Sequence, residues 1–130
     1  MTVIVRPAAA ADVEAIVNVG RVTWPAAYTA IAGEDYVSRG LAAWWDPADI
    51  AQAVRGGRAL VAVAGEQVVG VATYSVADEV LDLWKLYVLP QAQGTGAGSA
   101  LLTAVVEGPG AAAREIRLAH LDGNDRARAF

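Results

Sequence analysis

The pattern of apolar and polar positions near the start of the chain predicts a strand followed by a helix. Residues 2–6 alternate β-branched side chains and stop at Pro7, which lacks the backbone donor that a strand ladder needs. Asp12 then stands where a helix N-cap belongs, and a helix over about 12–22 would place four residues on one face, namely Val13, Ile16, Val17 and Gly20. We expect Trp24-Pro25 to interrupt this helix.

The segment from 24 to 45 is rich in glycine and aromatic residues and predicts one or two short helical pieces over a cleft. Asp46-Pro47 resembles an N-cap followed by a proline at the first helical position. It predicts a helix that runs to about Val54 and ends at Gly56-Gly57.

The second half of the chain reads mainly as strands. Two apolar runs, 59–64 and 67–76, flank a tight turn and predict an antiparallel hairpin. We further expect a strand over 80–89, a helix over 96–107, a strand over 115–121, a turn at Asp122-Gly123-Asn124, and the start of a helix over 125–130. This order indicates an α/β or α+β layered fold in a single domain spanning 1–130.

Composition narrows the class of protein. The chain has 130 residues, 55% hydrophobic and 18% charged, which suits one domain with a real core and excludes disorder. Ten basic and fourteen acidic residues give a formal charge of −4 without a charge block, so we expect no nucleic-acid partner. No apolar run nears the roughly 20 residues of a membrane span, and we expect a soluble, cytoplasmic protein with no membrane partner. The absence of cysteine excludes a disulfide scaffold, a thiolate zinc site and a cysteine nucleophile.

A glycine-rich loop carries the strongest chemical signal. Gly94, Gly96 and Gly98 follow a strand and open a helix, so the free N–H groups of loop and helix start converge on one small volume. Such a nest at the positive end of a helix dipole binds phosphate. The alternative is a glycine-rich turn without a ligand. The spacing fits neither a Walker loop nor a dinucleotide fingerprint.

The loop Gln93-Gly94-Thr95-Gly96-Ala97-Gly98, preceded by Leu86-Tyr87-Val88-Leu89-Pro90, resembles the cofactor loop of the GCN5-related N-acetyltransferases (GNAT). Residues 3–8 with Asp12 resemble that family's opening strand and helix, and residues 124–130 its last-helix motif. The resemblance implies a mixed, mostly antiparallel central sheet flanked by helices. Family members usually continue after the residue matching Phe130 with a tyrosine, the rest of that helix and two strands. We therefore expect the last helix and closing strands to be incomplete here, without the tyrosine that protonates the CoA thiolate in many relatives.

The resemblance implies acetyl-CoA as the cofactor and acetyl donor. It would lie in a wedge between the strand ending at Val88 and the strand 115–121, with pantetheine bonded to the main chain around Leu86, Tyr87 and Val88. The pyrophosphate would lie on the loop, and the residues implied there are Gln93, Gly94, Thr95, Gly96, Ala97, Gly98 and the Ser99 hydroxyl. Asn124 would either bind the cofactor or cap the last helix.

Acetyl transfer to an amine needs a base, and Asp82 lies where many relatives carry a glutamate that removes the amine proton. A period of two places Trp84, Leu86 and Val88 on its face of the strand. Glu79 is a second candidate base. The alternative is that both carboxylates belong to a solvated turn and strand start.

Other residues leave two interpretations open. His120, the single histidine, could titrate near neutral pH or be structural, and we leave it unassigned. Five aromatic residues fall where relatives build the acceptor pocket, and they would either line a pocket for an apolar or cationic amine or fill a core: Trp24, Tyr28, Tyr36, Trp44 and Trp45.

The sequence thus predicts an acetyl-CoA-dependent N-acetyltransferase acting on a primary amine of a small molecule or peptide. The alternative is a non-catalytic CoA-binding or dimerising interaction module derived from a truncated acetyltransferase. A homodimer is expected if the open edge of the strand 115–121 is covered by a partner.

Overall fold

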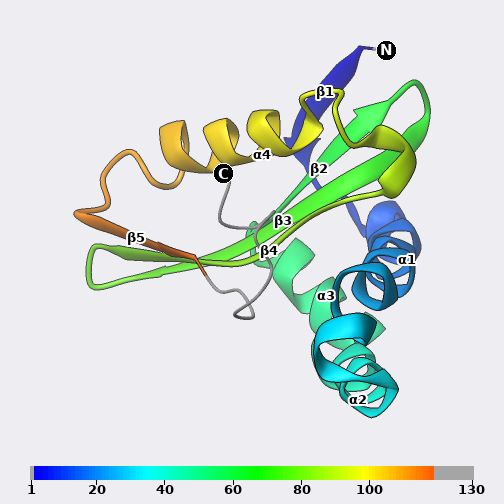
Figure 1. Ribbon diagram of the computed structural model, residues 1–130. Helices are drawn as coiled ribbons and strands as arrows, with labels where there is room; N and C mark the ends of the chain where they lie inside the picture. Colours follow the sequence, from blue (N-terminus) through cyan, green and yellow to red (C-terminus); the bar gives the residue numbers. More distant parts are fainter. Residues whose placement is uncertain (1, 119–130) are drawn as a thin grey trace.

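The computed structural model describes residues 2–118, in which a mixed β-sheet is sandwiched between helices (Figure 1). The elements are, in chain order, β1 (Val3–Pro7), the short 3₁₀ helix η1 (Ala10–Asp12), α1 (Val13–Ala32), α2 (Glu34–Trp44), α3 (Pro47–Arg55), β2 (Ala59–Ala64), β3 (Gln67–Ala77), β4 (Val80–Val88), the 3₁₀ helix η2 (Pro90–Ala92), α4 (Ala97–Glu107) and β5 (Glu115–Leu118).

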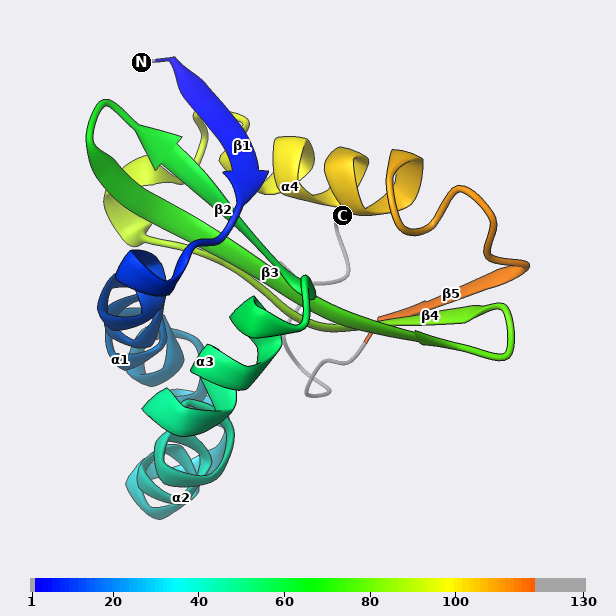
Figure 2. The same cartoon turned by 180° about the vertical axis from the view of Figure 1, so that it is seen from behind.

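The five strands lie in the order β1-β2-β3-β4-β5. The pairs β1–β2, β2–β3 and β3–β4 are antiparallel and β4–β5 is parallel. Helices α1, α2 and α3 lie on one face of the sheet and α4 lies on the other, as the two opposite views show (Figures 1 and 2). Because helices cover both faces, the central strand β3 is buried without interruption from Val68 to Tyr74. The mixed, mostly antiparallel sheet expected from the sequence is confirmed.

Helix α1 corrects the prediction that Trp24-Pro25 ends the first helix. It runs through Pro25 to Ala32. Proline removes one helical hydrogen bond, but Pro25 lies on the exposed side, where water can satisfy the freed carbonyl. Trp24 and Tyr28 are buried on the opposite side. Tertiary packing of these two rings therefore outweighs the local cost of proline, and only α2 remains of the short helical pieces expected up to residue 45.

Helix α3 begins as predicted. The Asp46 carboxylate accepts a hydrogen bond from the backbone N–H of Ala48 at 2.9 Å, and Pro47 occupies the first helical position. The hairpin of β2 and β3, the strand β4 and the helix α4 also lie within one or two residues of their predicted ranges.

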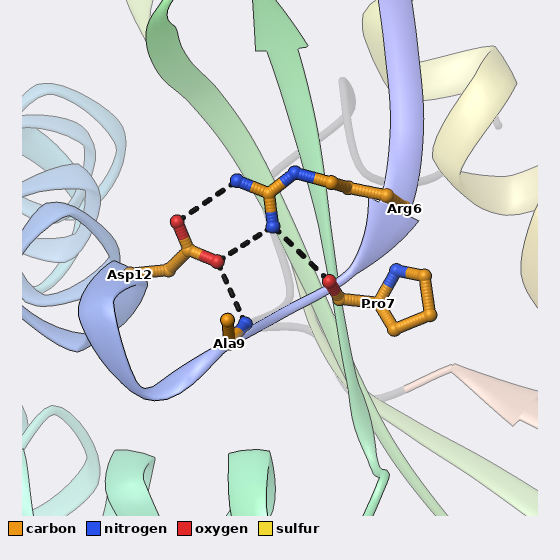
Figure 3. Close-up of polar contacts among 4 residues, drawn as sticks. All are labelled: Arg6, Pro7, Ala9 and Asp12. Carbon is orange, nitrogen blue, oxygen red and sulfur yellow. Dashed lines mark hydrogen bonds and ion pairs between the residues drawn. The ribbon is translucent and has the colours of Figure 1, made fainter.

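Asp12 corrects a second local prediction. It occupies the N-cap position of α1, but its carboxylate bonds backwards and does not cap the helix (Figure 3). Its oxygens accept two hydrogen bonds from the Arg6 guanidinium, at 2.7 and 3.0 Å, and one from the Ala9 N–H at 2.7 Å. The hydrogen bonds from Arg6 lower the pKa of Asp12 below 3.8, and the bond from Ala9 adds to this. The pair fastens β1 to the start of α1.

Several expectations concern positions outside the described residues. These are His120, Asn124, the strand beyond Leu118, the turn at 122–124 and the helix start at 125–130. Within residues 2–118 no helix is both long enough and apolar enough to span a bilayer. The same residues contain no group of three metal-ligating side chains.

Candidate active site

The glycine loop lies between η2 and α4 and has the backbone shape that its sequence requires. Gly94 and Gly96 adopt φ values of 86° and 88°, in the left-handed region that side chains disfavour. Space around both is open, since a Cβ built at either position meets no atom within 4 Å. Gly98 differs, because it is a buried helical residue without a positive φ. The backbone conformation therefore favours glycine at 94 and 96, while the role predicted for Gly98 in binding the cofactor stays a prediction.

Helix α4 begins with unsatisfied backbone donors. Its N-cap is Gly96, which has no side chain to accept a hydrogen bond. The N–H of Ala100 bonds to the Gly96 carbonyl at 2.9 Å, but no backbone acceptor within residues 2–118 receives the N–H of Ala97, Gly98 or Ser99. Exposed Ser99 lies in this first turn. An uncapped helix N-terminus of this kind favours an anion, so the loop fits the pyrophosphate of the expected cofactor.

Two loop side chains are turned inward. The Thr95 hydroxyl donates to the Ala92 carbonyl at 2.6 Å, and the Gln93 amide donates to the Val88 carbonyl at 3.4 Å. The Gln93 bond ties the loop to the end of β4, and the Thr95 bond ties it to η2. Backbone N–H groups, more than these side chains, are what the loop offers to a ligand.

The strand segment 86–88 has one free edge in the described part of the chain. On one side Leu86, Tyr87 and Val88 are in register with Ala72, Val71 and Gly70 of β3. On the other side the described pairing with β5 ends at Leu83 and Leu118. The edge of β4 next to the glycine loop therefore offers main-chain groups where the resemblance places pantetheine.

A β-bulge in β4 corrects the prediction of which residues share the face of Asp82. Lys85 is in register with Thr73, whereas Leu83 is in register with Tyr74, so Trp84 is an extra residue. Cross-strand partners share a face, and Ser75, the partner of Asp82, is two residues from Thr73. Asp82 therefore shares its face with Lys85 and Tyr87, while Leu86 and Val88 point to the opposite face.

Trp84 remains on the face of Asp82, as predicted. Its indole N–H donates to the Ser75 hydroxyl at 2.9 Å, and Ser75 is the cross-strand partner of Asp82. The opposite face belongs to α4, because a Cβ at Gly70 would lie 3.1 Å from Leu101 of that helix. The face with Asp82 is the one covered by α1, α2 and α3.

The two candidate bases differ in their surroundings. Asp82 is half-buried within β4, between Ser75 on β3 and Arg117 on β5. Glu79 lies in the β3–β4 turn with φ 64°, its side chain is 72% exposed, and its carboxylate is 4.0 Å from Arg114. Asp82 is thus fixed by the sheet beside the bulge, and Glu79 is a solvated turn residue paired with an arginine.

Lys85 is a charged residue of this face that the sequence did not single out. It is half-buried, and its ammonium lies 5.2 Å from the centre of the Trp45 ring, in a cation–π contact. Burial lowers the pKa of Lys85 below 10.5, while the carboxylate of Asp49 acts in the opposite direction. Within residues 2–118 its ammonium forms no ion pair.

Tyr87 joins the strand to the helical layer. Its hydroxyl oxygen lies 3.1 Å from that of Tyr28 on α1, and its ring meets that of Trp45 edge-on at 5.4 Å. Burial, and next the hydrogen bond with Tyr28, raise the pKa of Tyr87 far above 10.0. These contacts hold the Tyr87 side chain between β4 and the helices, which is a positioning role.

The five aromatic residues divide into two groups. Trp24, Tyr28, Tyr36 and Trp44 form one cluster, with neighbouring ring centres 4.8 to 6.4 Å apart, in which Trp24 and Tyr28 are buried and Trp44 is 48% exposed. Trp45 is 2% exposed and packs instead on Tyr87. It also forms part of the wall of a cavity of about 290 Å³ in the helical layer, lined by Val17, Arg21, Leu41, Ala42, Trp45, Asp46 and Pro47. Trp24, Tyr28 and Trp45 therefore fill the core, whereas the role of these rings in an acceptor pocket stays a prediction.

Sequence reasoning missed Lys85, the Tyr28–Tyr87 pair and the bulge at Trp84. A signal for Lys85 was available, because it is the single lysine of the chain and lies inside an apolar strand. Nothing in the sequence marks the bulge, because the apolar pattern of β4 is nearly continuous.

Solved structures of other proteins share this fold. No curated protein sequence matches the chain. The fold is similar to that of PaiA N-acetyltransferase from Thermoplasma acidophilum in complex with coenzyme A, with 20% identity, a TM-score of 0.91, and coverage of 100% of this chain and 86% of that chain.

Two further solved structures share the fold. Diaminobutyrate acetyltransferase EctA from Paenibacillus lautus, in complex with L-2,4-diaminobutyric acid and coenzyme A, is 16% identical with a TM-score of 0.76, over 98% of this chain and 70% of that chain. AAC(6′)-Iy in complex with the bisubstrate analogue CoA-S-monomethyl-acetylneamine is 17% identical with a TM-score of 0.68, over 99% of this chain and 86% of that chain.

The sequence itself gives the decisive match, which is to the acetyltransferase (GNAT) family over residues 22–130 and includes both the bulged strand and the glycine loop. The chain therefore belongs to the GNAT family of acetyltransferases.

Proposed function

We propose that this protein is an N-acetyltransferase that moves the acetyl group of acetyl-CoA to a primary amine of a small molecule or peptide. The observation that carries the proposal comes from residues 2–118, in which the N-terminus of α4 is uncapped and lies beside an unpaired edge of β4. The loop supplies donors for a pyrophosphate, and the adjoining strand supplies main-chain groups for the amides of pantetheine. Family membership supports this cofactor, and two of the similar solved structures contain coenzyme A, one of them together with the amine substrate L-2,4-diaminobutyric acid.

Acetyl-CoA, when bound, supplies the activated acetyl group as a thioester. The chain has to orient the cofactor, accept a proton from the acceptor ammonium and hold the neutral amine against the acetyl carbonyl. Asp82 is the proposed base, directly or through a water, because it is half-buried on β4 next to the bulge. The aromatic cluster and Tyr87 lie on the same face of the sheet and would help to exclude water there.

Substitution of Gly96 tests the cofactor assignment. Gly96→Val puts a β-branched residue at φ 88° and a side chain where the phosphate is expected, so we expect calorimetry to show loss of acetyl-CoA binding. Gly65→Val is the matched control, since Gly65 has φ 63° and open space around it but lies in the β2–β3 turn. Equal acetyl-CoA affinity of the two variants would refute the loop assignment.

Turnover is the second test. Release of the CoA thiol can be followed with a thiol reagent without background, because the chain contains no cysteine. Amine-dependent thiol release would establish transfer. Tight acetyl-CoA binding without release for any amine would instead favour the non-catalytic CoA-binding alternative.

A further inference from the structure

Asp82 and Lys85 place opposite charges on one face of β4, on the side of the helices α1 to α3. The bulge brings them closer than their numbering suggests, because their partners on β3, Ser75 and Thr73, are only two residues apart. At about 3.4 Å per residue, their backbone positions are about 7 Å apart. Without the extra residue Trp84 they would point to opposite faces.

The Lys85 ammonium is held in position, but no carboxylate of the described residues forms an ion pair with it. The Trp45 ring holds the ammonium at 5.2 Å, and Trp45 is itself fixed by packing on Tyr87. The acid that most affects Lys85 is Asp49, an exposed residue of α3 that does not reach ion-pair distance. A half-buried cation without an ion pair binds an approaching anion more strongly than an exposed cation does, because the attraction between charges is stronger where water is excluded.

The Asp82 carboxylate is also available to bind a ligand. It forms no hydrogen bond or ion pair within residues 2–118, and its register partner Arg117 bonds instead to Glu115 at 3.3 Å. Among the described residues, this face therefore presents a carboxylate without an ion pair at one end and, at the other, an ammonium that contacts the Trp45 ring. A molecule with an amine and a carboxylate separated by several bonds is complementary to both.

We propose that Lys85 is a specificity-determining residue of the acceptor site, and that the acceptor is an amine that also carries a carboxylate. This inference rests on the proposed function. The amine would face Asp82 and the acetyl group, while the carboxylate would bond to the Lys85 ammonium. The same ammonium would repel diamines, whose second cation would come to lie beside it.

Matched substrate pairs test the inference. Each aminocarboxylate is compared with the amine that remains when its carboxylate is removed: 4-aminobutyrate with propylamine, ornithine with 1,4-diaminobutane, and lysine with 1,5-diaminopentane. We expect a higher kcat/KM for the carboxylate member of at least one pair. Lys85→Met, which keeps the apolar contact with Trp45, should remove that preference by about tenfold or more, and Lys85→Glu should reverse it toward the diamine. Acetyl-CoA affinity, measured by calorimetry, reports that both variants are folded.

A direct measurement does not depend on turnover. Because Lys85 is the single lysine, protein labelled with ¹³Cε-lysine gives one lysine signal. In the CoA complex this signal should move on addition of an aminocarboxylate, drawn from the three above and the twenty standard amino acids, and not with its decarboxylated partner. A signal that moves only with diamines, or with none of the compounds, overturns the inference. Failure of acetyl-CoA itself to bind would be a failure of the proposed function and is seen separately by calorimetry.

Discussion

The hydroxyl oxygens of Tyr28 on α1 and Tyr87 on β4 lie 3.1 Å apart, across 59 residues of sequence. This contact joins the helical layer to the strand that carries Asp82 and Lys85. It also completes a series of ring contacts that begins at exposed Trp44, passes through Trp24 to Tyr28, and continues from Tyr87 to Trp45. The helices are thus held over the face on which the acceptor is proposed to bind.

Tyr87→Phe should lower the free energy of unfolding by about 1 kcal/mol, because the part-buried hydrogen bond between the Tyr28 and Tyr87 hydroxyls is lost. Tyr36→Phe is the matched control, since no hydrogen bond of the Tyr36 hydroxyl occurs within residues 2–118. Urea denaturation of both variants measures the difference. Equal stability of the two would contradict the role given to the pair.

The raised pKa of Tyr87 predicts alkaline sensitivity. In the unfolded chain this phenol ionises near pH 10, whereas in the folded state it stays protonated, so the folded state binds more protons above that pH. Its contribution to stability is complete below about pH 10 and is lost as the pH rises beyond it. Tyr87→Phe should therefore flatten the decline in stability between pH 10 and 11.5. A decline as steep as in the parent protein would show that other groups cause it.

The ion pair between Arg6 and Asp12 predicts the opposite pH dependence. The pKa of Asp12 is lower in the folded state than 3.8, so its contribution is present above that pH and is lost as the pH falls through the folded value. Asp12→Ala should cost about 1 to 2 kcal/mol at pH 7, at the lower end because the Arg6 side chain is 43% exposed. Glu66→Gln, in the exposed β2–β3 turn, is the control. Denaturation at pH 7 and pH 2.5 should show the Asp12→Ala penalty shrinking in acid.

Gly20 makes room for Trp45 against α1. A Cβ at this position would overlap the Trp45 indole. Although alanine favours a helix over glycine by about 1 kcal/mol, we expect Gly20→Ala to lower the melting temperature, because overpacking costs about 1 to 3 kcal/mol. Combining it with Trp45→Leu should reduce the penalty. A Gly20→Ala protein more stable than the parent would show that the indole can move aside.

Asp82→Asn separates catalysis from binding. We expect kcat to fall by about 10² to 10⁴, the usual contribution of a general base, with acetyl-CoA affinity unchanged. Glu79→Gln should leave kcat within a few fold, since Glu79 is a solvated turn residue next to Arg114. Thiol release under saturating acetyl-CoA measures both. The reverse order of effects would move the role of base to Glu79.

The sequence by itself determined those structural features that depend only on neighbouring residues. Asp46-Pro47 starts a helix because the carboxylate reaches an N–H two residues on. Gly94 and Gly96 allow a left-handed backbone that other residues resist, and so they identify the loop before α4. The alternation and length of the apolar runs predicted the strands and the β2–β3 hairpin, whereas the mixed sheet was implied by the resemblance to the GNAT family.

Only the tertiary structure decided which side chains meet on a common face. Pro25 stays within α1 because burial of Trp24 and Tyr28 outweighs one missing hydrogen bond. The extra residue Trp84 brings Lys85 and Tyr87 to the same face as Asp82. A strict period of two would place both on the opposite face. Strand register and packing energies depend on partners that are distant in the sequence. One inserted residue exchanges the two faces of a strand, and the local sequence carries no sign of it.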